Sequence, residues 1–470
     1  MFRWKAEVLK RMPGSVVEID TFEVDGQVYF HRFFCALKSC IDGFKEGCRP
    51  YLCIDSTALN GRWNGHLASA IAVDGHTWMY PMAFGFIASE TEDNWTWFMR
   101  QLKQAIGEPP LLAICTDACK GLENSVQKVF PTAEQRECFF HLMKNFQKRF
   151  QGFGRIYPAA RAYREDMFTE HMAAIFSEPD EIWKWMTQYH PLLWYRCGFN
   201  PEIKCDFITN NLAEVFNNWI RGIKDLPVAE LADKVREMIM VLWRKRRRIA
   251  EKLPTGKILP AVMVQLKANT RGLAHLKVVK SGSWSAEVWD YSKGGERHRV
   301  KLNEKTCTCQ EWQHIGKPCQ QALAFLTTQK NVDLEQFVHH YFSVEKFQAA
   351  YGREIEPLAD KSQWPRVHLP FSVCAPLTKK NVGRQRKLRF KSCLERGHRK
   401  KGDNHDTNSA PTNGDGNPDN SALTNSKGKK MIRGPVICKR CGEKGHRQAS
   451  SKCPLNGTKK RQVDLILTLL

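Results

Sequence analysis

The sequence predicts an α/β fold built around a mixed β-sheet, and three stretches of the chain carry this prediction. Residues 51–57 (YLCIDST) and 111–117 (LLAICTD) are short apolar runs bounded by polar residues, a pattern typical of buried parallel strands. Residues 209–220 have the spacing of an amphipathic helix, with an apolar face formed by Leu212, Val215, Phe216, Trp219 and Ile220. A change of pattern after Pro254 indicates that a smaller second module follows.

The composition favours a multidomain protein with a nucleic-acid partner. The chain has 470 residues, 42% of them hydrophobic, and a formal net charge of +23. Residues 378–470 contain 23 Lys and Arg against 7 Asp and Glu, so most of the excess charge lies in this tail. A basic tail suits a polyanion such as DNA, although a tail that only aids solubility fits the same composition.

The same composition argues against a secreted or membrane protein. Residues 1–5 are charged and lack the apolar core of a signal peptide. No run approaches the ~18 apolar residues that a membrane helix needs. The 17 cysteines are therefore interpreted as reduced thiols or zinc ligands in a cytosolic or nuclear protein.

The first part of the chain is expected to form strands and one helix before the core begins. Residues 1–48 form a lead-in with strands near 16–20 and 27–30 and a helix over 33–44. The core then continues with strands over 66–73 and 78–87. A helix over 94–106 follows, whose aromatic residues we expect to pack on the sheet. A helix over 121–129 and a short strand over 134–137 complete this region.

The long interval between residues 117 and 214 is expected to be a helical insertion. Helices are predicted over 139–150, 159–175 and 179–189, with Trp183, Trp185 and Trp194 in the core. A long helix over 226–251 follows and ends in five consecutive basic residues, 244–248. This run fits phosphate binding or a nuclear import signal, and equally a solvated helix end whose cations suit the helix dipole.

Three carboxylates on these elements predict a divalent-metal site. Asp55 and Asp117 end the two predicted strands, and Glu214 lies on the polar face of the 209–220 helix. Oxygen ligands of this kind hold Mg²⁺ or Mn²⁺, and two such ions can clamp a phosphoryl transfer. Each carboxylate taken singly is more simply read as a strand cap or a solvent-facing side chain.

The sequence segments around these acids resemble the Mutator-like element (MULE) transposase domain of plants. The resemblance is carried by residues 49–55, 94–98, 116–117, 138–146 and 210–214. It implies an RNase H-like core over residues 49–225 in which Asp55, Asp117 and Glu214 are the catalytic DDE triad. The implied activity is metal-dependent DNA cleavage and strand transfer in the nucleus, with a homo-oligomer left open. Residues 226–268 are expected to be a helical connector.

A different class of function also fits this resemblance. Plant regulators of light signalling resemble the same transposase body, so a domesticated, non-catalytic DNA-binding or transcription regulator is the alternative. In the family, DNA-binding modules lie upstream of this point, and we expect none in this chain. The Cys138 and His141 pair is shared with the family, and it is either half of a metal site or a buried structural pair.

Residues 269–345 resemble a SWIM-type zinc finger. Strands are predicted over 275–279, 286–290 and 298–302, followed by Cys307, Cys309 and Cys319 in the family's C-x-C and C-x-H pattern. Zinc in a structural site takes four N or S ligands. Here Gln321 occupies the histidine position, and His314 in the gap is a substitute that the family pattern does not predict. The alternative is a zinc-free ββα module held by Trp312, Leu323 and Phe325.

The remaining chain is predicted to be a disordered basic linker carrying a zinc knuckle. Residues 346–430 are the linker, and Arg384, Arg386 and Lys387 within it resemble an AT-hook that binds the DNA minor groove. Residues 431–456 have the spacing C-x2-C-x4-H-x6-C of a CCHC knuckle, and residues 457–470 form a tail. The expected zinc ligands are Cys438, Cys441, His446 and Cys453. Cys393 and His398 are read as plain linker.

Overall fold

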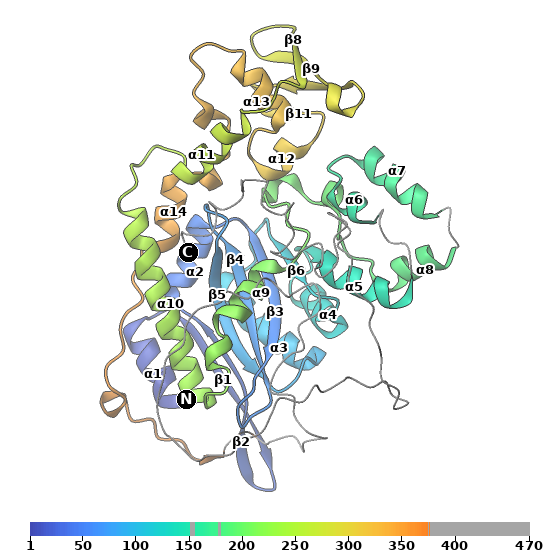
Figure 1. The fold of residues 1–470 in the computed structure, drawn as a ribbon. Helices are drawn as coiled ribbons and strands as arrows, with labels where there is room; N and C mark the ends of the chain where they lie inside the picture. The colour runs from blue at the N-terminus through green and yellow to red at the C-terminus, as the bar shows by residue number, and fades with distance from the viewer. Residues whose placement is uncertain (151–155, 177–179, 375, 377–470) are drawn as a thin grey trace, which may run out of the picture. The chain divides into compact units, whose positions relative to one another are not determined.

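The computed structural model describes residues 1–150, 156–176, 180–374 and 376, and in them the predicted α/β architecture is confirmed (Figure 1). The larger sheet has the strand order β1-β2-β5-β4-β3-β6-β7, with β12 added beside β2. Its strands are β1 (Val16–Val24), β2 (Gln27–Ala36), β3 (Tyr51–Ala58), β4 (His66–Val73), β5 (Met79–Ile87), β6 (Ala113–Thr116), β7 (Glu134–Glu137) and β12 (Val373–Cys374).

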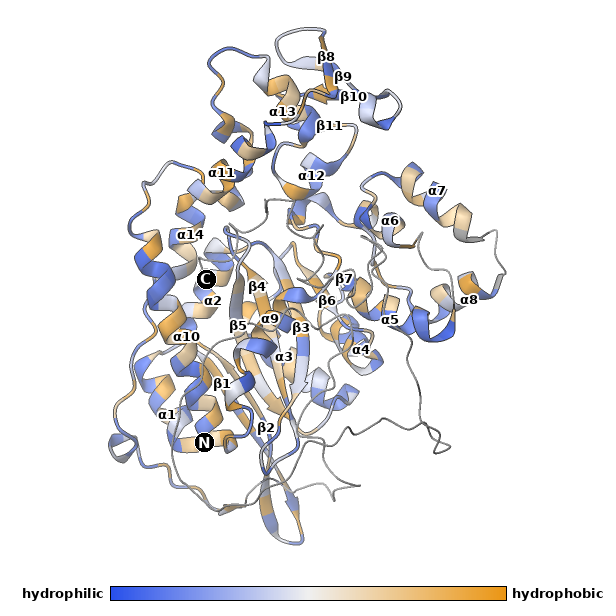
Figure 2. Ribbon diagram, in the orientation of Figure 1, coloured by the Kyte–Doolittle hydropathy of each residue, from blue (hydrophilic) through white to orange (hydrophobic). Residues whose placement is uncertain are grey.

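The direction of pairing changes at β3. From β1 to β3 every neighbouring pair along the order β1-β2-β5-β4-β3 is antiparallel. From β3 onward, β6 and β7 are parallel to it. Figure 2 shows that the central strands are predominantly hydrophobic, and every residue of β5 is buried. Such continuous burial is typical of strands covered on both faces.

One predicted helix begins later than expected. The apolar run that starts at Phe33 continues as strand β2 up to Ala36, and helix α2 (Lys38–Gly47) starts only after it. Phe33 pairs with Phe86 of β5, so cross-strand packing determines the conformation here. Periodicity alone does not distinguish a short buried strand from a buried helical turn, which explains the error.

Helix α3 (Glu92–Ile106) is positioned by its own cap and by a close approach to the sheet. Thr91 accepts the Asn94 N–H at 3.4 Å, and Glu92 and Asp93 lie in the first turn, as helix N-termini favour. A Cβ on Gly85 of β5 would lie 2.4 Å from the Phe33 carbonyl oxygen and 3.1 Å from Phe98 of α3, so only glycine fits. Trp95 and Phe98 are buried, which confirms that these aromatics pack in the core.

The predicted helical insertion is present and has a hydrophobic core of its own. It comprises α5 (Phe139–Arg149), α6 (Ile156–Arg161), α7 (Glu165–Phe176) and α8 (Asp180–Tyr189). The single helix predicted over 159–175 is therefore two, because the Ala162 carbonyl accepts the Cys197 N–H at 3.0 Å and the chain turns there. Trp185 and Trp194 are buried as predicted, whereas Trp183 is 51% exposed.

Three helices follow the insertion, and one of them crosses the sheet. Helix α9 (Asn211–Trp219) packs on β3, β4 and β5 and lies in front of them in Figure 1. Leu212, Ala213 and Phe216 form its buried face, whereas Val215 is 43% exposed, so the predicted apolar face is rotated slightly. Helices α10 (Val228–Ala250) and α11 (Pro260–Asn269) come next.

The basic run at the end of α10 is not a uniform charged surface. Arg246 is buried, and it donates to the Met79 carbonyl oxygen and to the Tyr351 hydroxyl, each at 2.6 Å. Arg247 forms ion pairs with Glu251 and Glu354. Arg244, Lys245 and Arg248 are exposed, so three of the five cations remain available to solvent or to a partner.

A second, four-stranded sheet has the order β11-β10-β9-β8. Its strands are β8 (Leu276–Lys280), β9 (Ser285–Asp290), β10 (Glu296–Lys301) and β11 (Thr306–Cys307), followed by helices α12 (Glu311–Ile315) and α13 (Gln320–Thr327). The chain then returns to the larger sheet through α14 (Val344–Tyr351), which packs on α2 and α10, and β12, whose Val373 pairs with Val28. The boundary expected at residue 345 falls inside α14. Helix α1 (Phe2–Arg11) and α4 (Lys120–Val129) complete the longer helices.

Among the described residues, no helix is long and apolar enough to cross a membrane. The residues expected to form the AT-hook, the knuckle and the tail lie outside the described part of the chain. The linker predicted over residues 346–430 begins too early, because residues 346–374 are described and include most of α14 and strand β12.

Candidate nuclease and zinc sites

Asp55 lies at the point where β3 loses its parallel neighbour. Residues 51–53 of β3 pair with residues 113–115 of β6, and Asp55 is two residues beyond the last of these pairs. The strand itself does not end there, because β3 continues to Ala58 in antiparallel pairing with β4. The prediction that the strand ends at Asp55 is therefore wrong, although the carboxylate does occupy the carboxyl end of the parallel pair, where sites collect.

The Asp55 carboxylate is buried, and two hydrogen bonds fix its position. It is 8% exposed, Oδ1 accepts the Ser56 N–H at 2.8 Å, and Oδ2 accepts from Asn217 Nδ2 of α9 at 3.1 Å. Burial, followed by the negative charge of Asp117, raises the pKa of Asp55 to about 8. The metal-free site therefore holds a proton on Asp55 at neutral pH.

Asp117 directly follows β6 and faces the same acidic cluster. Its Oδ1 accepts the Cys119 N–H at 3.3 Å at the start of α4. Burial, and then the charge of Glu90, raises the pKa of Asp117 to about 6. A divalent cation placed between two such carboxylates would favour their ionised forms, because its positive charge offsets the cost of burying them.

The third predicted acid, Glu214, is brought to this edge of the sheet by α9. It lies in the first turn of the helix, and its charge contributes to the raised pKa of Asp55. One turn further on, Asn217 makes the direct contact with Asp55. The structure therefore brings Asp55, Asp117 and Glu214 near the same edge of the sheet, although among the described residues their oxygen atoms do not all lie within 4.8 Å of one another. The contact from α9 to Asp55 is made by the Asn217 amide.

Sequence reasoning missed a fourth acid, Glu90, in the loop between β5 and α3. Its Oε1 accepts the Ser56 hydroxyl at 2.7 Å, next to Asp55 in the chain. Its charge raises the pKa of both Asp55 and Asp117. A signal was present, because Glu90 follows the buried strand 79–87 just as Asp117 follows residues 113–116. The same strand-end rule therefore finds it.

The Cys138 side chain anchors α9. Cys138 is fully buried; its Sγ lies 3.0 Å from Asn210 Oδ1 and accepts the Asn210 N–H at 3.3 Å. Burial raises the pKa of Cys138 to about 12, so the thiol stays protonated and can donate. Because Asn210 is the residue before α9, this pair fixes the start of the helix that carries Glu214 and Asn217. In the part of the chain that the structure describes, Cys138 and His141 belong to no cluster of metal ligands.

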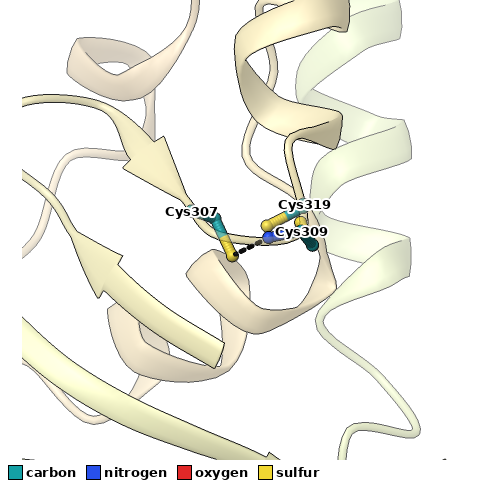
Figure 3. A group of neighbouring side chains, drawn as sticks. All are labelled: Cys307, Cys309 and Cys319. Carbon is teal, nitrogen blue, oxygen red and sulfur yellow. Dashed lines mark hydrogen bonds between the residues drawn. The ribbon is translucent and has the colours of Figure 1, made fainter. Parts of the chain in front are cut away.

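The second site consists of three sulfur atoms in the smaller module (Figure 3). The Sγ atoms of Cys307, Cys309 and Cys319 lie within 4.8 Å of one another, and the Cys309 N–H donates to Cys307 Sγ at 3.5 Å. Hydrogen bonds from Cys309 and Cys319 lower the pKa of Cys307 to about 4. A group of three thiols that already stabilises one thiolate fits a soft ion such as Zn²⁺.

The two polar residues considered for the fourth position have different surroundings. Gln321 is buried, and it lines a cavity of 350 Å³ together with Cys309. His314 is buried against Tyr163, with ring centroids 5.6 Å apart, and burial lowers its pKa to about 4. Among the described residues no histidine, His314 included, is grouped with the three cysteines, so the structure leaves the fourth position without an assigned ligand. Trp312, Leu323 and Phe325 form the buried centre of the module, as predicted.

Comparison with known proteins identifies two domains. Residues 51–145 match the family model of the MULE transposase domain, and residues 293–320 match that of the SWIM zinc finger. The chain thus contains a stretch similar to the MULE transposase domain and one similar to the SWIM zinc finger, which confirms the resemblance read from the sequence. In particular, it carries a MULE domain that contains Asp55, Glu90 and Asp117, whereas Glu214 lies beyond the matched residues.

Three curated proteins are similar to parts of the chain. Protein FAR1-RELATED SEQUENCE 6 of Arabidopsis thaliana is 26% identical over 170 residues, which is 36% of this chain and 20% of that protein. Protein FAR1-RELATED SEQUENCE 5 of the same plant is 30% identical over 97 residues, 20% of this chain and 12% of that protein. A PKS-NRPS hybrid synthetase of Chaetomium globosum is 35% identical over 65 residues, 13% of this chain and 1% of that protein. The matches therefore span a fifth or less of each relative.

Proposed function

We propose that this protein acts on DNA in the nucleus as a metal-dependent DDE transposase, cutting DNA strands and transferring them. The observation that carries the proposal is the meeting of Asp55 and Asp117 on neighbouring parallel strands, with raised pKa values that a divalent cation would relieve. The strand order β5-β4-β3-β6-β7 supports an RNase H-like assignment for this core, since three antiparallel strands are followed by two parallel ones.

The proposed site would hold Mg²⁺ or Mn²⁺ through Asp55, Asp117 and Glu214, with Glu90 as a fourth carboxylate. Two such ions supply charge neutralisation for the attacking and leaving oxygens of a phosphodiester. The protein's own contribution is positioning. The sheet fixes the two aspartates, Asn217 orients the Asp55 carboxylate, and Cys138 holds the helix from which Asn217 and Glu214 project.

The zinc sites belong to the same proposal as structural and nucleic-acid-binding parts. Cys307, Cys309 and Cys319 would hold Zn²⁺ in the smaller module, and Cys438, Cys441, His446 and Cys453 would hold a second ion in the knuckle. A structural zinc contributes folding energy outright. The exposed cations Arg244, Lys245 and Arg248, with the basic residues Arg384, Arg386 and Lys387, would contact DNA phosphates.

The alternative is a transposase-derived regulator that binds DNA without cutting it. Its support is the similarity to two FAR1-related proteins and the glutamine at position 321, where the SWIM pattern has histidine. The retained carboxylates and their electrostatic coupling favour the catalytic reading. The two readings make opposite predictions about metal-dependent strand cleavage.

A nicking assay on supercoiled duplex DNA with Mg²⁺ or Mn²⁺ distinguishes them. We expect the wild-type protein to nick, and Asp117→Asn to lower the rate by roughly a hundredfold or more, because the metal loses a charged ligand. Asp25→Asn is the matched control, since Asp25 lies in the exposed β1–β2 turn with φ 51°, a conformation that asparagine accepts. Nicking by Asp117→Asn at the wild-type rate would refute the site. DNA binding without nicking by folded wild-type protein would favour the regulator.

A further inference from the structure

The three sulfur atoms of the smaller module leave one position of a tetrahedral zinc site without a residue assigned to it. Structural zinc takes four N or S ligands, and the match to the SWIM model ends at residue 320, one residue before Gln321. A glutamine amide oxygen is neutral and belongs to neither ligand class. Within the described ranges, no fourth His, Cys, Asp or Glu residue has a ligand atom within 4.8 Å of all three sulfur atoms, so a fourth ligand has to move toward them.

A buried histidine next to this group lacks a hydrogen-bond partner on one ring nitrogen. His298 of β10 is 2% exposed, and its Nε2 makes no hydrogen bond to any described residue. The neighbouring Glu296 Oε1 lies 3.6 Å away, beyond hydrogen-bonding distance. Buried polar atoms are nearly always satisfied, so an orphaned ring nitrogen requires an explanation. A metal ion that binds there is one such explanation.

The strand pairing places His298 beside the cysteines. Val300 of β10 pairs with Cys307 of β11, and one step further the Thr308 N–H donates to the Arg299 carbonyl oxygen at 3.1 Å. Strand β11 ends at Cys307, and Cys309 follows in a turn; because the two strands are antiparallel, the chain beyond Cys307 runs toward the part of β10 that carries His298. His298 Nδ1 also lies 3.5 Å from the hydroxyl of Thr308, the residue between two of the cysteines.

The space between these groups is polar and large enough for the ring to turn. His298, Cys309 and Gln321 line the same 350 Å³ cavity, which Glu296 and Glu311 also line. Arg164, from the segment between α6 and α7, forms an ion pair with Oε1 of Glu296, the same oxygen that lies nearest to His298. Histidine ligands of zinc commonly bond a carboxylate or hydroxyl through the other ring nitrogen. Thr308 lies at Nδ1 of the His298 ring and can serve in this way when Nε2 binds the ion.

We propose that His298, and not Gln321, is the fourth zinc ligand of this module. The site then has three cysteines and one histidine, with two ligands from the β11 segment, one from the start of α13 and the histidine from β10. The histidine ligand would then come from β10 instead of the start of α13. This explains how the module can have glutamine at position 321 and still provide four zinc ligands. The inference rests on the zinc binding proposed for Cys307, Cys309 and Cys319.

The test measures metal binding by the full chain, with the knuckle removed as a second site by Cys438→Ser and Cys441→Ser. In this background, we expect one zinc per chain and a cobalt-substituted form with the visible absorption bands of a tetrahedral site made of three sulfur ligands and one nitrogen ligand. His298→Ala should lower the zinc affinity at least about tenfold, since even residues that only support a ligand have effects of this size. Gln321→Ala should bind zinc as tightly as the parent.

Two further variants keep the result interpretable if His298→Ala folds poorly. His298→Cys should retain the metal and shift the cobalt spectrum toward four sulfurs. Adding Gln321→His to His298→Ala should restore affinity by returning the ligand to the usual position. Unchanged affinity and cobalt spectrum in both His298 variants would overturn the inference. So would a loss of affinity in Glu311→Gln alone, which would identify a carboxylate ligand. Absence of zinc in the parent would refute the zinc proposal itself.

Discussion

The two candidate metal sites of this protein are assembled in opposite ways. The sulfur site takes its three cysteines from one short segment, residues 307–319, so its residues are close in space because they are close in sequence. The acidic site takes Asp55 from β3, Asp117 from the end of β6 and Glu214 from α9, and only the folded sheet brings them together. One site therefore depends on local chain geometry, and the other depends on the whole core.

The difference extends to what each site does for stability. Three thiols that converge on one point would stabilise the fold of the small module, because a zinc ion bound to them would hold its segments together. Buried carboxylates with raised pKa values are a cost to the metal-free fold, since their ionised forms are destabilised by burial. Replacing one cysteine should therefore unfold the module that holds the sulfur site. Replacing one buried carboxylate should instead make the metal-free protein more stable. Four predictions test this contrast.

The largest expected effect is the loss of the sulfur site. Cys307→Ser should release the module's zinc and unfold the region from β9 to α13, because a structural zinc supplies on the order of 10 kcal/mol. Hydrogen exchange should show lost protection in residues 285–327 and normal protection in β3 and β6. Cys374→Ser, in β12, is the control and should change neither region. Full protection of residues 285–327 in Cys307→Ser would show that the module does not need the metal.

The second prediction concerns the anchor of α9. Cys138→Ala should lower the free energy of unfolding by about 1–3 kcal/mol more than Cys138→Ser, because alanine leaves the buried Asn210 groups without a partner. Both variants lose a similar volume, so their difference isolates the hydrogen bonds. Denaturant unfolding gives both values. Equal stabilities would mean that Asn210 finds another partner and that the thiol is simply part of the core.

The third prediction is that a substitution in a buried site raises the stability of the metal-free protein, whereas most substitutions of buried residues lower it. The pKa of Asp55 is raised to about 8 in the folded protein, above its ordinary value of 3.8, so the folded state retains a proton that the unfolded state loses. Stability is therefore lost as pH rises from about 4 through 8. Asp55→Asn should raise the melting temperature of the metal-free protein at pH 8 by about 2–4 °C, with little change at pH 4.

Asparagine should be accommodated there because Asn217 can turn its amide and offer Oδ1, which has no partner among the described residues. Calorimetric melts at the two pH values give the answer. A variant that melts lower than wild type at pH 8 would show that Asp55 is stabilised in its ionised form, contrary to the electrostatic argument.

The smallest expected effect concerns the acid that was missed in the sequence. Glu90→Gln removes the charge that, after burial, most raises the pKa of Asp117. The pKa of Asp117 should therefore fall, and the pH at which Mn²⁺ binding is half-maximal should move down by a fraction of a unit. The matched control Glu108→Gln, which changes an exposed loop residue, should leave the pH of half-maximal Mn²⁺ binding unchanged. An upward shift would mean that Glu90 acts chiefly as a metal ligand.

The sequence predicted the parts of these sites that are local and missed those that depend on packing. The C-x-C spacing located the sulfur site, but His298 lies on another strand and only the β10–β11 register brings it close. The strand-end rule found Asp55 and Asp117, whereas Glu90 was overlooked because it lies three residues beyond the end of its strand and the rule was not applied there.

The fold itself was predicted where burial is continuous, as in β4 and β5, and misjudged where a run such as residues 33–36 fits two structures. The exposed Trp183 and Val215 show the same limit, because composition and spacing do not say which face of a helix finds a partner.

The central claim is that Asp55 and Asp117 form one metal site, and Mn²⁺ binding followed by electron paramagnetic resonance tests it most directly. The account predicts that the wild-type protein binds Mn²⁺, that Asp55→Asn and Asp117→Asn each weaken binding by at least about tenfold, and that the two substitutions together cost little more than either alone. Asp25→Asn should bind as the wild type does. Equal Mn²⁺ affinity in all five proteins would show that the buried carboxylates hold no ion, and the account would be contradicted.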